Sequence, residues 1–110
     1  NYKLGIISNF DSRVYDVMNN LEIQEYFDAF VISSEAGHAK PDPNIFHLAL
    51  KEMGADPKGC LHIGDNIQND FHGPRALGIQ ALLLDRENEY ESIGEQHKIK
   101  SLNEIDRFLD

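Results

Sequence analysis

Short, mostly apolar runs alternate along this chain with stretches whose apolar residues recur every three or four positions. Four of the runs are predicted as strands, at residues 4–7, 30–32, 61–63 and 81–84. Helical spacing follows the first three, and this regular strand–helix alternation is typical of a parallel sheet with helices on both faces. The pattern therefore predicts an α/β fold of the three-layer, Rossmann-like kind.

The helical stretches carry recognisable start and stop signals. Asp11 or Ser12 can cap the first helix, and Asp42 can cap a second helix, with proline at its first position and Gly54 after its end. A third helix is expected over 68–77, interrupted by Gly73-Pro74 and closed by Gly78. Ser101 and Glu104 have the spacing of a capping box for the last helix. The predicted buried stripes are Val14, Val17, Met18 and Leu21; Phe46, Ala49, Leu50 and Met53; and Leu102, Ile105, Phe108 and Leu109.

Polar residues lie just past several of these runs. Ser8-Asn9 follows the first run, Lys40 lies in the loop that precedes Pro41, and Gly64-Asp65 follows the third run. Right-handed crossovers place the carboxyl ends of parallel strands at one edge, where ligands of open α/β sheets bind. We therefore expect these three segments to contribute to one site.

Asp65 and Asp70 have a spacing that suits a hard divalent cation. Magnesium prefers a few carboxylate oxygens and keeps several waters. Asp65 is the expected direct ligand, and Asp70 would hold a metal-bound water or orient Lys40. The alternative is that Asp65 only caps the helix that follows it.

Ser8, Asn9 and Lys40 are candidates for binding phosphate. Hydroxyl, amide and backbone N–H groups can bind phosphate oxygens, and a lysine held beside a proline can neutralise a transferring phosphoryl group. The simpler alternatives are turn chemistry for the serine and a solvated surface position for the lysine.

The composition of the chain limits which partners and which location are expected. The 110 residues are expected to form one domain, residues 1–110, and the net charge of −9 argues against nucleic acid or an anionic membrane as a partner. The single cysteine excludes an intrachain disulfide and favours a reducing, cytoplasmic location. No apolar run approaches the roughly 18 residues of a membrane span. The sequence does not indicate an oligomeric state.

The order and spacing of these segments resemble the haloacid dehalogenase superfamily of phosphohydrolases. Ser8 in Ile7-Ser8-Asn9 matches the second family motif, Lys40 in 37–43 the third, and Asp65 in 64–70 the fourth. The resemblance implies that Ser8 and Lys40 surround a transferring phosphoryl group and that Asp65 binds Mg²⁺. Residues 8–13 and 73–78 further resemble the subgroup of haloacid dehalogenase-like hydrolase domain-containing protein 3.

One family motif is absent. The first motif, Asp-x-Asp-x-Thr on the first strand, supplies the nucleophile in the family, and this chain holds neither it nor the cap that follows it. Together with the non-Met start, this indicates the C-terminal part of a core domain, carrying motifs two to four and lacking its first strand and cap. The expected function is that of a phosphatase acting on a small phosphate ester through an aspartyl-phosphate, with the fragment alone inactive.

Two other classes of function remain open. One is a non-catalytic binding or regulatory protein on the same scaffold. The other is a phospho-accepting receiver domain, which is disfavoured because its acidic pair should follow the first strand and its lysine the last, the reverse of the order seen here.

Overall fold

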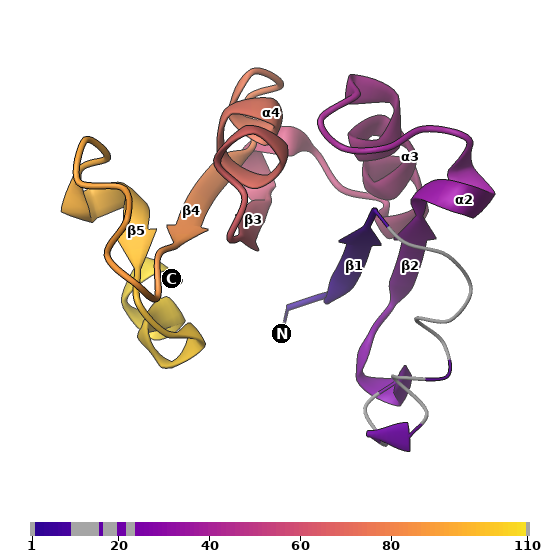
Figure 1. Ribbon diagram of the computed structural model, residues 1–110. Helices are drawn as coiled ribbons and strands as arrows, with labels where there is room; N and C mark the ends of the chain where they lie inside the picture. The colour runs from indigo at the N-terminus through magenta and orange to yellow at the C-terminus, as the bar shows by residue number, and fades with distance from the viewer. Residues whose placement is uncertain (1, 10–15, 17–19, 22–23, 110) are drawn as a thin grey trace. The chain divides into compact units, whose positions relative to one another are not determined.

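A computed structural model describes residues 2–9, 16, 20–21 and 24–109 (Figure 1). The chain divides into two compact units, residues 1–57 and 58–110, and each is considered by itself. The helix predicted after Asp11 or Ser12 lies largely outside the described residues. The assignment of 1–110 to one partial core domain stays a prediction.

The first unit contains a two-stranded parallel sheet. Strand β1 (Gly5–Ser8) pairs with the parallel strand β2 (Ala29–Ile32). Most residues of β1 are half-buried, whereas β2 is almost fully buried. A 3-10 turn, η1 (Gln24–Tyr26), precedes β2, and a short helix, α2 (Ser33–Ala36), follows it. Both predicted strands are therefore confirmed, whereas the short helix has no counterpart in the prediction.

Helix α3 (Pro43–Met53) packs on β1 and β2 and begins as its sequence predicts. The Asp42 carboxylate accepts the Asn44 N–H at 2.9 Å, and Gly54 ends the helix in the left-handed conformation at φ 62°. Ile45 is fully buried although the predicted stripe omitted it. The stripe is thus wider than predicted, because the helix faces two strands.

The second unit contains a three-stranded parallel sheet in the order β3 (Leu61–Gly64), β4 (Gln80–Leu84), β5 (Lys98–Ile99). A 3-10 turn, η2 (Pro57–Gly59), precedes β3. Strand β4 lies in the middle and contributes Ala81, Leu82 and Leu83 to the core of this unit. β5 was not predicted, since two residues between polar neighbours are too few to show a pattern.

The helix expected over 68–77 is built from two pieces. A π-helical segment, η3 (Ile67–His72), runs directly into α4 (Gly73–Arg75). The Gly73 N–H bonds to the carbonyl of Gln68, five residues back, and this wider turn accommodates Pro74, which has no N–H to donate. Gly78 closes the segment at φ 84°, as predicted.

The last segment confirms its predicted cap but not its predicted helix type or its whole buried side. After η4 (Glu95–His97) and β5, a 3-10 helix, η5 (Leu102–Phe108), begins with the Ser101–Glu104 capping box. Leu102 is 51% exposed, so its predicted burial is wrong. A 3-10 helix aligns side chains three residues apart, so Leu102, Ile105 and Phe108 still share one face, of which Ile105 and Phe108 are half-buried. Within the described part of the chain, no helix is long and apolar enough to cross a membrane.

Candidate active site

In the first unit, the residue after β1 holds the loop that carries Lys40. The Asn9 side chain donates from Nδ2 to the Lys40 carbonyl at 3.0 Å and accepts the Lys40 N–H on Oδ1 at 2.7 Å. Two hydrogen bonds to the backbone of one residue fix both its distance from Asn9 and its orientation. The structure therefore brings Asn9 and the Lys40 backbone together, and Ser8 directly precedes Asn9 in the chain.

Contacts of Asp42 also hold this loop. The Asp42 N–H donates to the Ala39 carbonyl at 2.8 Å, and His38 Nδ1 lies 3.5 Å from Asp42 Oδ2. Prolines on one side of Lys40 predict a stiff loop, and the hydrogen bonds at Asn9 and Asp42 hold its backbone as well. The Ser8 side chain is half-buried at the end of β1, beside this loop.

In the second unit, Asp65 follows β3 and is exposed. It lines a pocket of about 190 Å³ together with the segment that follows β4, including Arg86, Glu87 and Tyr90. The helix that follows is capped by the next residue instead: Asn66 Oδ1 accepts the N–H groups of residues 68 and 69, at 3.0 and 2.9 Å. Asp65 therefore is not the cap, and it lines a pocket.

Asp70 has a different setting. It is 4% exposed, its Oδ1 lies 2.9 Å from His62 Nε2, and its Oδ2 accepts the Asn66 N–H at 3.1 Å. A Cβ placed on Gly64 would overlap the Asp70 carboxylate, so this glycine leaves room for the acid. His62 is thereby a satisfied, largely buried side chain, as its position inside a strand predicts.

The donors of Asp65 and Asp70 suit magnesium. Carboxylate oxygens are hard ligands, and Mg²⁺ needs only one or two of them beside water and phosphate. Among the described residues no group of three His, Cys, Asp or Glu side chains is placed to hold a metal ion. The roles of Ser8, Lys40, Asp65 and Asp70, and the meeting of both units at one site, stay predictions.

Sequence reasoning missed a third acid, Asp85 at the end of β4. Its Oδ1 accepts the Glu89 N–H at 2.7 Å, its Oδ2 accepts the Tyr90 N–H at 2.9 Å, and Lys98 Nζ lies 3.7 Å away. Burial acts to raise the pKa of Asp85, but the two N–H donors and the lysine outweigh it and lower the pKa below its ordinary value. The available signal was an aspartate directly after an apolar run, the same signal that marks Asp65.

Comparison with known proteins decides the family. Residues 1–78 match the family model described as haloacid dehalogenase-like hydrolase. The chain belongs to the haloacid dehalogenase-like hydrolase family. The predicted resemblance and the α/β fold class are thereby confirmed.

Individual relatives agree with this membership in the haloacid dehalogenase-like family. Haloacid dehalogenase-like hydrolase domain-containing protein 3 of Bos taurus is 36% identical over 113 residues, 98% of this chain and 45% of that protein, which confirms the predicted subgroup resemblance. Glyceraldehyde 3-phosphate phosphatase of Methanothermobacter thermautotrophicus is 34% identical over 87 residues, 78% of this chain and 38% of that protein. The chain thus spans less than half the length of either relative.

A solved structure shows the same fold. The magnesium-bound HAD-hydrolase of Bacillus subtilis superimposes with a TM-score of 0.86 at 21% identity, covering 98% of this chain and 48% of that chain.

Proposed function

We propose that this chain is the C-terminal part of a magnesium-dependent phosphatase of the haloacid dehalogenase-like family, acting on a small phosphate ester in the cytoplasm. The observation that carries the proposal is the contrast at the end of β3. Asp65 is exposed and lines a pocket, while Asp70 is buried and holds the turn behind it. Two relatives in the comparisons support the chemistry, one named as a phosphatase and one holding magnesium.

Each predicted residue has a role in this proposal. Asp65 would bind the metal directly, and Asp70 fixes the turn and would hold a metal-bound water. Ser8 and Asn9 bind phosphoryl oxygens, and the Lys40 ammonium offsets their charge. Magnesium, when bound, would supply further positive charge to the oxygens of the phosphoryl group.

The nucleophile in this proposal lies outside the chain. An aspartate of the first family motif attacks phosphorus, forming an acyl-phosphate bond as the ester P–O bond breaks, and the leaving oxygen takes a proton. Water then cleaves the aspartyl-phosphate and releases inorganic phosphate. We expect the 110-residue chain alone to show no turnover.

The burial of the strands supports a longer protein. All four residues of β3 are only half-buried, and β1 has no fully buried residue, whereas β2 and β4 each bury three. Strands inside a doubly covered parallel sheet are ordinarily buried along their length. Further packing on β1, and likewise on β3, would account for the difference.

The test is phosphatase activity of the full-length protein on p-nitrophenyl phosphate with Mg²⁺. Asp65→Asn should lower kcat by about 1000-fold, the scale of losing a major electrostatic contribution to the transition state. The control Glu91→Gln, at an exposed position outside the pocket, should leave kcat within about twofold. Removing Mg²⁺ with a chelator should abolish turnover reversibly.

Two results would contradict the proposal. Activity that survives in Asp65→Asn would remove the metal role of this carboxylate. An inactive full-length protein whose upstream sequence lacks Asp-x-Asp-x-Thr would instead favour a non-catalytic binding or regulatory protein on this scaffold.

A further inference from the structure

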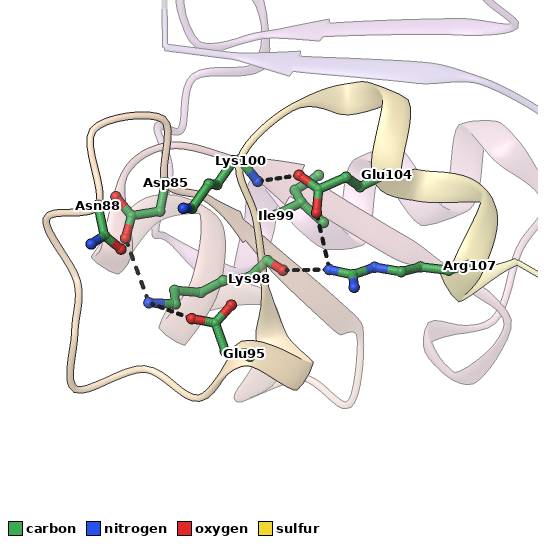
Figure 2. A pocket seen from close by; sticks show the side chains of 8 residues that line it. All are labelled: Asp85, Asn88, Glu95, Lys98, Ile99, Lys100, Glu104 and Arg107. Carbon is green, nitrogen blue, oxygen red and sulfur yellow. Dashed lines mark hydrogen bonds and ion pairs between the residues drawn. The ribbon is translucent and has the colours of Figure 1, made fainter.

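The segment between β4 and β5 is held by a buried ion pair. Asp85 and Lys98 have side chains that are 4% and 6% exposed, and their charged atoms lie 3.7 Å apart. Figure 2 shows Lys98 extending from β5 toward Asp85, with Glu95 on its other side. Removing two charges from water is costly unless they are paired and hydrogen-bonded. The burial of this pair therefore indicates a structural role.

The role of the pair is to hold the backbone that it contacts. Asp85 accepts the N–H groups of Glu89 and Tyr90, one on each carboxylate oxygen. Lys98 Nζ donates to the Tyr90 carbonyl at 2.9 Å. Both polar backbone groups of Tyr90 are thus held, one by each partner of the pair, and Asn88 between them takes the left-handed turn at φ 57°.

The loop held in this way forms one side of the Asp65 pocket. Residues 86, 87, 89 and 90 line that pocket together with Asp65. The Tyr90 side chain also packs on the cluster of Phe71, Ala81 and Leu83, the same cluster that Ile67 contacts two residues after Asp65. The loop and the segment that carries Asp65 therefore share one packed support within the second unit.

We infer that Asp85 and Lys98 are positioning residues for the reaction at Asp65. They hold loop 86–90 against the pocket, and that loop helps to select which phosphate esters can enter. This inference rests on the proposed phosphatase function. It assigns no contact with substrate to the pair itself, since both side chains are buried, although Asp85 also borders the Asp65 pocket.

The neighbouring pair Glu104 and Arg107 offers a matched control. It lines the same 120 Å³ pocket as Asp85 and Lys98, with its charged atoms 3.1 Å apart, and Figure 2 shows it on the other side of β5. Within the part of the chain that is described, its hydrogen bonds reach the backbone of residues 98, 100 and 101 and none of residues 86–90. Breaking it should leave the loop in place.

The experiment compares Asp85→Asn, Lys98→Met and Arg107→Gln in the full-length protein with Mg²⁺ and p-nitrophenyl phosphate. The asparagine can accept only one of the two N–H groups, because its amide nitrogen is a donor. In both loop variants, KM should rise about tenfold with kcat within about threefold, and amide exchange over 86–90 should accelerate about tenfold. Arg107→Gln should change neither, and Asp65→Asn should lower kcat while leaving exchange of the loop unchanged.

Two outcomes would overturn the inference: unchanged loop exchange in Asp85→Asn, or equal effects in Arg107→Gln. If the full-length wild type shows no turnover that depends on Asp65, the proposed function fails instead. The exchange rates, which need no activity, would then decide whether the pair positions the loop. Lys98→Arg, which keeps the charge, should restore part of the loss if Lys98 acts through the ion pair rather than through packing alone.

Discussion

The ends of β3 and β4 each carry an aspartate directly after an apolar strand, yet the two carboxylates have opposite settings. Asp65 is exposed and lines a pocket, and the helix after it is capped by Asn66. Asp85 is buried and uses both oxygens to hold the following loop. The same local pattern therefore leaves one carboxylate exposed at a pocket and gives the other an architectural task.

The difference follows from what lies behind each strand end. After β3, the structural tasks are taken by Asn66 and Asp70, which leaves Asp65 available for a ligand. After β4, Asp85 performs the task with Lys98, whose ammonium also lies 3.7 Å from Glu95. A carboxylate is thus available for function where neighbouring side chains satisfy the backbone around it.

The largest structural effect is expected at Gly64, where the β3 end is most tightly packed. Gly64→Ala places a methyl group in the volume of the Asp70 carboxylate and should lower the free energy of unfolding by about 2–3 kcal/mol. Urea unfolding measures this change. The control Gly59→Ala, which would meet no atom within 4 Å, should change it by less than about 0.5 kcal/mol.

Removal of the Asp70 carboxylate should have a slightly smaller effect. Asp70→Ala leaves His62 Nε2 and the Asn66 N–H without this acceptor and should cost about 2 kcal/mol in urea unfolding. In the double variant with Gly64→Ala the two costs should not add, because the overlapping carboxylate is gone. Additive costs would show that Gly64 is needed for another reason.

The role of Asp85 at the end of β4 should appear in the pH dependence of the free energy of unfolding. The pKa of Asp85 is lowered in the folded state, so its ionised form stabilises the fold above its ordinary pKa of 3.8, and this contribution is lost as the pH falls through the folded value. Asp85→Asn lacks the group, so its free energy of unfolding should depend less steeply on pH below about 4. Thermal unfolding across acid pH measures the slope, and an unchanged slope would remove the role assigned to this acid.

The smallest effect on stability is expected at the residue proposed to matter most for activity. Asp65→Asn should change the free energy of unfolding by less than about 0.5 kcal/mol, since the side chain is exposed and does not cap the helix. Thermal unfolding without metal provides the measurement. A large loss would mean that Asp65, like Asp85, has an architectural task.

The sequence predicted the elements whose signals are local. Apolar runs located four strands, Asp42-Pro43 located the start of α3, and Ser101 with Glu104 located a capping box. It missed β5, whose two residues become a strand only by pairing with β4, and the π-helical turn, which depends on how Pro74 is accommodated. Partners such as His62 with Asp70, or Asp85 with Lys98, arise from packing and have no fixed spacing to recognise.

The candidate site likewise has features that the sequence predicts and features that it does not. Residue types and order predicted Ser8, Lys40 and Asp65, because polar groups after parallel strands gather at one edge. They could not predict that Asn66 rather than Asp65 caps the helix, since both side chains are competent caps and only the backbone geometry distinguishes them.

The Asn9 side chain has a consequence for the ageing of the molecule. Its amide presents a donor and an acceptor to the peptide of Lys40. Hydrolysis of that amide to a carboxylate would keep the acceptor but replace the donor with a negatively charged oxygen facing the Lys40 carbonyl. A single deamidation event would thus release the loop from β1, and the chemical lifetime of one exposed asparagine would limit how long the Lys40 loop keeps its place.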